Sequence, residues 1–103
     1  MNQQAMLRKV MKMKQEMEQT QKEINETEYT ATSGGGIVSV TALGTKQIVK
    51  IEVKEDFECE GKEDLEILLD SIVAASQQVI KDIDKDTEQK LAKYTALLGG
   101  FGF

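Results

Sequence analysis

The stretch SGGGIVSVTALGTKQIVKIEV, residues 33–53, decides the fold of this 103-residue chain. Apolar and polar side chains alternate within it, first over residues 38–42 and again over residues 49–53, and most of the apolar ones are β-branched. A period of two with β-branched residues indicates strands that have one covered face. Two turn signals, Gly34–Gly36 and Gly44-Thr45, divide the region. Because the connections are too short for crossover helices, we predict an antiparallel meander with strands near residues 28–33, 37–43 and 46–53.

The glycines Gly34–Gly36 have two interpretations, a phosphate cradle or a tight turn. A phosphate-binding loop needs a helix after the glycines, so that amide N–H groups and a helix N-terminus converge on the anion. Here a strand pattern follows instead, and no Lys-Ser or Lys-Thr pair stands at the required spacing. Glycine also supplies the positive φ that a hairpin turn requires. The sequence therefore favours a hairpin turn.

Helices are predicted on both sides of the strands. Residues 2–26 contain no Gly or Pro and are rich in Gln, Glu, Lys and Met, which favour helix. After a polar connector over residues 54–63, a second helix is expected from about Glu63 to Leu98, with acidic residues in its first turn where the helix dipole favours them. The chain is thus expected to form one α+β domain of α-β-β-β-α order, residues 1–98, followed by a flexible Gly/Phe tail, residues 99–103.

The first predicted helix carries an apolar seam with the spacing of a heptad repeat, in which Thr20 fills one position. A helix of this length extends roughly 35 Å, so the small sheet can cover only part of it. We interpret the seam as a coiled-coil contact with another protomer, the alternative being a helix that lies on its own sheet. The charged segment 84–93 is likewise expected to project or to pair with another protomer. The predicted dimer-interface residues are Met6, Val10, Met13, Met17 and Ile24.

Charge is segregated along the chain. The net charge is −5, yet residues 1–15 contain four basic side chains and no acidic one, whereas residues 16–103 contain all 18 carboxylates and 9 Lys. Three of the four basic residues can share one helix flank, which favours contact with phosphates of duplex DNA; the alternative is an ordinary solvated helix face. No aromatic residue lies among them, and no turn-helix arrangement supplies a recognition helix, so weakly selective binding is expected. The predicted DNA-binding residues are Arg8, Lys9, Lys12 and Lys14.

Composition argues against several classes of function. The chain has no His and a single Cys, Cys59, which eliminates His-dependent nucleophilic triads, His-containing and Cys-only zinc sites, and internal disulfides. The acidic residues of the connector lack the ligand spacing of an EF-hand and are expected to be solvated. We therefore expect no enzyme activity, no cofactor, no metal and no small-molecule substrate. Without a signal-peptide pattern or a long apolar run, a cytoplasmic protein with no membrane segment is expected.

Residues 33–53 resemble the central signature of the YbaB/EbfC family of bacterial nucleoid-associated proteins, with its Ser-Gly-small-Gly step, alternating Val strand and Val-x-Ile strand. The flanks agree, because a Met/Gln/Lys-rich helix precedes the signature and KEDLEILLDSIVAASQQVIKDI, residues 62–83, follows it with an Ala74-Ala75 step. The resemblance implies an α-β-β-β-α protomer and a tight homodimer whose long helices project like tweezers. It also implies DNA binding with little or modest sequence preference.

Two functional hypotheses follow. The first is a non-enzymatic nucleoid-associated protein that binds duplex DNA as a homodimer with little sequence specificity, through the basic residues of the first helix. The alternative is a helical adaptor that grips another protein and has no direct role at DNA, which the overall acidity supports. Duplex affinity at about 50 mM salt separates the two, because phosphate contacts are strong at low ionic strength.

Overall fold

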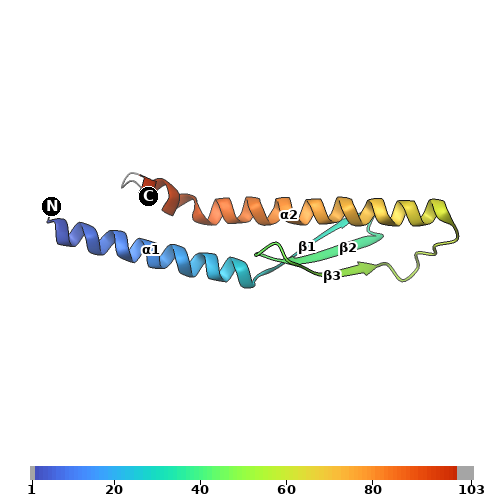
Figure 1. The fold of residues 1–103 in the computed structure, drawn as a ribbon, viewed down its shortest axis with the longest axis horizontal. Helices are drawn as coiled ribbons and strands as arrows, with labels where there is room; N and C mark the ends of the chain where they lie inside the picture. Colours follow the sequence, from blue (N-terminus) through green and yellow to red (C-terminus); the bar gives the residue numbers. More distant parts are fainter. Residues whose placement is uncertain (1, 100–103) are drawn as a thin grey trace.

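The computed structural model describes residues 2–99. Along the chain, one long helix precedes a three-stranded sheet and a second long helix follows it (Figure 1). The molecule is elongated, with principal extents of 71 × 19 × 16 Å. The elements are α1 (Gln3–Glu26), β1 (Glu28–Ser33), β2 (Val38–Leu43), β3 (Ile48–Val53) and α2 (Lys62–Gly99). The predicted α+β class, element order and antiparallel meander are confirmed, although β2 and β3 begin one and two residues later than expected. Apart from Gly99, which ends α2, the tail predicted to be flexible lies outside the described residues.

The sheet has the strand order β1-β2-β3, with both pairs antiparallel. Gly34, Gly35 and Gly36 connect β1 to β2 with φ values of 64°, 69° and 93°, a region that side chains other than glycine rarely occupy. The N–H groups of Gly36 and Ile37 donate to the carbonyls of Ser33 and Gly34 and are therefore used inside the turn. The hairpin interpretation of the glycines is confirmed.

The second connection brings the end of α1 onto the sheet. The Gly44 N–H donates to the Thr27 carbonyl at 3.0 Å, and a Cβ at position 44 would lie 1.8 Å from the Ile24 carbonyl oxygen. Only glycine permits this approach, because no side-chain rotation can relieve a contact with backbone. The left-handed residue of this turn is Lys46, whose φ is 74°. The turn predicted at Gly44-Thr45 is present. Gly44 is needed there because the Ile24 backbone leaves no room for a Cβ, and its own φ is not in the left-handed region.

Two separate cores hold the elements together. At the sheet, the first half of α2 covers one face of β1 and β2, burying Ala31, Val38, Val40, Ala42, Ala75, Val79 and Ile83. Further along, the second half of α2 packs on α1, and there the buried residues are Val10, Tyr94 and Leu98, with Met13, Met17 and Leu91 against them. The segment 84–93 was expected to project or to pair with another protomer. In the structure α2 continues through this segment and Leu91 packs on α1 of the same protomer, while pairing of the segment with another protomer stays a prediction.

One polar network ties β1 to α2 between the two cores. The Tyr29 hydroxyl donates to the Asp86 carboxylate, which also forms an ion pair with Lys90 at 2.9 Å. Burial and the adjacent Asp86 carboxylate raise the pKa of Tyr29 to about 12. The hydrogen bonds from Tyr29 and Lys90 lower the pKa of Asp86. The carboxylate therefore stays ionised and holds the strand and the helix together.

Candidate nucleic-acid interface

The four basic residues predicted to bind DNA lie on the first half of α1, and all are exposed. The Asn2 side chain caps this helix by accepting a hydrogen bond from the Gln4 N–H at 2.7 Å, which satisfies one of the free donors at its start. Arg8 and Lys12 lie about 160° around the axis from the buried Val10, at 3.6 residues per turn. Lys9 and Lys14 fall on the two flanks between that side and the packed stripe. Arg8 and Lys12 therefore lie on the side of α1 away from α2, whereas Lys14, about 40° from Val10, lies next to the packed stripe.

The structure adds the end of α2 to this surface. Because Val10 clusters with Tyr94 and Leu98, the start of α1 lies beside the end of α2, as Figure 1 shows at the left. We call residues 2–15 and 89–99 together the cationic end; they contain six basic residues and no Asp or Glu. Lys93 adds an exposed charge, with its ammonium 4.9 Å from the centroid of the Tyr94 ring. The sequence reasoning missed Lys93, because only the antiparallel helix pairing brings it near Arg8 and its neighbours.

The opposite end of the molecule has the opposite charge. Residues 52–70, called the acidic end here, contain nine carboxylates and two Lys. They include the connector between β3 and α2, which Figure 1 draws in green to yellow at the end remote from both termini. Carboxylates repel the phosphates of a duplex. The acidic end is therefore the less favourable of the two ends for an anionic partner.

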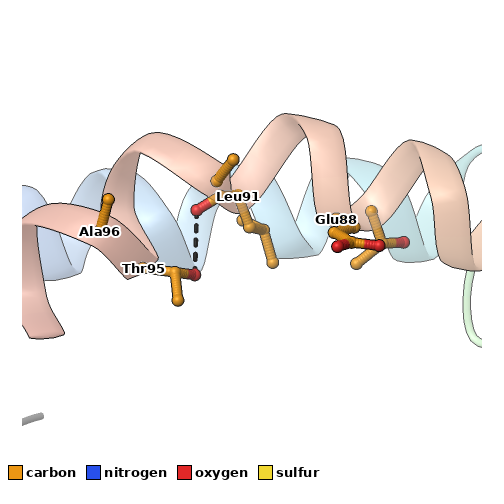
Figure 2. A pocket seen from close by; sticks show the side chains of 6 residues that line it. Glu88, Leu91, Thr95 and Ala96 are labelled. Carbon is orange, nitrogen blue, oxygen red and sulfur yellow. Dashed lines mark hydrogen bonds between the residues drawn. The ribbon is translucent and has the colours of Figure 1, made fainter.

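Other surfaces offer little for chemistry. A hollow on α2 is lined by Thr87, Glu88, Leu91, Ala92, Thr95 and Ala96. Figure 2 shows these side chains on a single helix, with the Thr95 hydroxyl donating to the Leu91 carbonyl of its own backbone at 3.1 Å. Convergent polar groups, which a small-molecule site needs, are missing from it. Within residues 2–99, no three His, Cys, Asp or Glu side chains are grouped to hold a metal ion, and Cys59 is exposed on the connector.

Three of the five predicted dimer-interface residues, Val10, Met13 and Met17, belong to the cluster that joins α1 to α2 within the protomer. Val10 and Ile24 are only 6% and 1% exposed, and Met13 and Met17 pack against the cluster that joins α1 to α2. Met6 is 40% exposed and is the most accessible of the five. A role of this seam between protomers stays a prediction, and for Val10, Met13 and Met17 it would require side chains that already pack against the helix pair.

Comparison with known proteins agrees with this architecture. The sequence profile of the YbaB/EbfC DNA-binding family matches residues 1–98. The chain belongs to this family. A nucleoid-associated protein of Agathobacter rectalis is 36% identical over 95 residues, which cover 92% of this chain and 82% of that protein. A nucleoid-associated protein of Oceanobacillus iheyensis is 39% identical over 79 residues, covering 77% and 74% of the two chains.

A solved structure supports the fold of this YbaB/EbfC family member. The crystal structure of an uncharacterised Helicobacter pylori protein, HP0035, superposes with a TM-score of 0.67 at 24% identity, covering 94% of this chain and 98% of that one. The match spans nearly both full chains and therefore includes the helix pair as well as the sheet. Within residues 2–99, neither helix combines the length and apolar character that a membrane span requires.

Proposed function

We propose that this protein is a cytoplasmic nucleoid-associated protein that binds duplex DNA as a homodimer, with little sequence preference, through phosphate contacts at the cationic end. The observation that carries the proposal is the gathering of six basic residues, one of which (Lys90) is paired with Asp86 of the preceding turn, at one end of an otherwise acidic molecule. Membership of a DNA-binding family and the similarity to nucleoid-associated relatives support it. An enzymatic role has no support in the described residues, among which no three potential metal ligands are grouped.

Low specificity follows from the shape of the cationic end. A major groove admits one helix, whereas here α1 and the end of α2 lie side by side. Such a pair fits across the phosphate backbones better than inside one groove. Five of the six basic residues are Lys, which binds phosphate as a point charge and lacks the bidentate geometry that reads guanine. Phosphate contacts position a protein without carrying sequence information.

The salt dependence of binding tests this proposal. If Arg8, Lys9, Lys12 and Lys14 of both protomers neutralised phosphates, the slope of log K against log[salt] would reach about −7, since each contact contributes about −0.9. Partial engagement gives about half that slope. We expect fluorescence anisotropy with a labelled duplex to show binding at about 50 mM salt that weakens steeply as salt is added.

A matched pair of variants locates the contact. Arg8→Glu/Lys12→Glu should reduce duplex affinity at least about tenfold, because two cations on the outer side of α1 become anions. Lys22→Glu/Lys62→Glu changes the net charge by the same amount as Arg8→Glu/Lys12→Glu, at exposed positions outside the cationic end. This control variant should retain most of the affinity for the duplex. No binding at low salt, or equal losses in both variants, would contradict the assignment of the cationic end.

The adaptor hypothesis keeps one observation in its favour. Leu7 and Met11, on the same half of α1, are 60% and 54% exposed, and exposed apolar residues together suit protein contacts. This hypothesis expects no duplex affinity at about 50 mM salt. It also expects Leu7→Lys/Met11→Lys to abolish capture of a protein partner, because both exposed apolar side chains become charged.

A further inference from the structure

The hollow on the second half of α2 follows the surface of that helix (Figure 2). Its lining side chains form two rows with a spacing of four residues, the spacing that makes a ridge on a helix. One row is Thr87, Leu91 and Thr95, and the other is Glu88, Ala92 and Ala96. The lining is mostly apolar, and the hollow has a volume of about 430 Å³. Since an apolar cavity of about 150 Å³ accommodates benzene, the hollow has room for two phenyl rings.

Two phenyl rings follow directly after this helix in the chain. Residues 100–103, GFGF, lie outside the described residues and contain two of the three Phe of the chain. The four-residue spacing of the two rows leads to positions 99 and 100, which are both glycine. No side chain at these positions therefore closes the hollow at the end from which the segment departs. The side chains of the segment carry no charge that an apolar lining would leave unpaired.

The end of α2 needs hydrogen-bond donors for its carbonyls. The last four carbonyls of a helix have no partner within it, and no basic residue lies in the last turn of α2. A chain reversal through a left-handed glycine supplies backbone N–H donors to such carbonyls, and Gly100 can adopt that conformation without steric cost. In this reversal the residue after the glycine contacts a side chain five or six positions before it. For Phe101 these are Ala96 and Thr95, which both line the hollow.

We propose that the segment after α2 folds back along the helix and places the rings of Phe101 and Phe103 in the hollow. Side chains two residues apart in an extended segment point to the same side and are about 6.7 Å apart. Ala92 and Ala96 are about 6 Å apart along the helix axis, at 1.5 Å per residue. Phe101 therefore packs on Ala96, and Phe103 packs on Ala92 one turn earlier. This docking requires neither DNA nor a second copy of the chain, and it goes beyond the proposed function.

Attachment to α2 favours this segment over a separate partner. A segment joined to its site by a few residues is present there at a local concentration in the millimolar range. It also loses less translational and rotational freedom on docking than a free molecule does. A separate apolar partner would therefore have to displace the two rings before it could occupy the hollow.

Docking has a consequence for the helix pair. Leu91 lines the hollow and also packs against the cluster that joins α1 to α2. Rings in the hollow therefore cover the outer side of a residue that already contributes to this contact. They add buried apolar surface where, among the described residues, only Val10, Tyr94 and Leu98 are buried together. Because local stability depends on buried apolar surface, the docked segment stabilises the helix pair at the cationic end.

A single tryptophan reports the docking, because the chain has no Trp of its own. In Phe101→Trp, the indole should emit at shorter wavelength than a solvated indole and resist quenching by acrylamide. Adding Ala96→Glu places a charge in the hollow, so the emission should move to that of a solvated indole. Ala74→Glu makes the same change at an exposed position of α2 outside the hollow and should leave the emission unchanged. Solvated emission in Phe101→Trp itself, or equal emission in the two Glu variants, would overturn the proposal.

A mixing experiment separates docking on the same chain from docking on a second copy. The Phe101→Trp/Ala96→Glu chain should keep its solvated emission when wild-type protein is added in excess. Wild-type protein contributes no Trp signal, so only the tail of the variant is observed. A return of the short-wavelength emission would mean that the tail occupies the hollow of a neighbouring copy, and the proposal would be wrong.

Hydrogen exchange tests the native rings without a reporter. Phe101→Ser/Phe103→Ser should speed amide exchange in the last turns of α2 about tenfold, because the apolar cover of the hollow is lost. Phe101→Leu/Phe103→Leu keeps apolar side chains at both positions and should retain most of the protection. Exchange in the sheet should be the same in all three proteins. Equal exchange at the end of α2 in the wild type and the Ser variant would overturn the docking of the tail.

Discussion

At the sheet, seven buried side chains from β1, β2 and α2 form one core, whereas at the cationic end only Val10, Tyr94 and Leu98 are buried together among the described residues. Local stability depends on how much apolar surface each region buries. The sheet therefore serves as the rigid base, and the helix pair serves as an arm held by a thin core. The basic residues therefore lie in the region with the smaller core, and most of the buried apolar surface lies at the sheet, away from them.

The junction between the two regions should give the largest effect. Gly44→Ala would set a Cβ against the Ile24 backbone, forcing the end of α1 away from the sheet, and should reduce the free energy of unfolding by about 3 kcal/mol. Urea denaturation followed by circular dichroism measures it. Gly61→Ala is the matched control, since a Cβ there meets no atom within 4 Å. Similar losses in both would show that the close approach at Gly44 does not matter.

The same truncation in each core should give unequal losses. Val79 is fully buried against the sheet and Val10 is 6% exposed in the arm. We expect Val79→Ala to lower the free energy of unfolding by about 2.5 kcal/mol, and Val10→Ala by about 1 kcal/mol, because the thin arm core can relax around the lost methyls. Hydrogen exchange should show that Val10→Ala mainly deprotects the arm. An equal or larger loss at Val10 would break the comparison between base and arm.

The role of α2 in the cationic end can be tested at Lys93. Lys93→Glu should weaken duplex binding about three- to tenfold at 0.1 M salt and make the salt slope shallower by about one per protomer. Lys81→Glu makes the same change of charge at an exposed position of α2 outside the cationic end and should have little effect. If only variants of α1 weaken binding, the DNA contacts are confined to that helix.

The link between base and arm should give the smallest effect, with a pH signature. Tyr29→Phe removes the hydrogen bond to Asp86 and should cost about 1 kcal/mol of unfolding free energy at pH 7. Because the pKa of Tyr29 rises from 10.0 to about 12 on folding, its contribution is full below pH 10 and is lost as the pH rises to about 12. The Asp86 contribution is lost in acid, as the pH falls through its lowered pKa. Chemical denaturation at pH 9 and pH 11 should show an alkaline loss in the wild type that Tyr29→Phe reduces.

Local periodicity determined most of the fold. The alternation over residues 38–53 and the absence of Gly and Pro from residues 2–26 predicted the strands and first helix within two residues of their observed bounds. These patterns are reliable because side-chain direction repeats every two residues in a strand and every 3.6 in a helix. The part of the cationic end on α1 was also predicted from the sequence, since Arg8 and Lys12 are close in the chain.

The helix that covers the apolar seam of α1 became clear from the packing of whole elements. An apolar stripe requires burial, but it does not specify the partner that buries it. The tertiary structure placed Val10 on Tyr94 and Leu98, and so brought Lys93 to the cationic end. It also showed that β3 stays uncovered although its alternation predicts a buried face. A sequence alone determines periodicity and local charge, whereas contacts between distant residues depend on how whole elements pack.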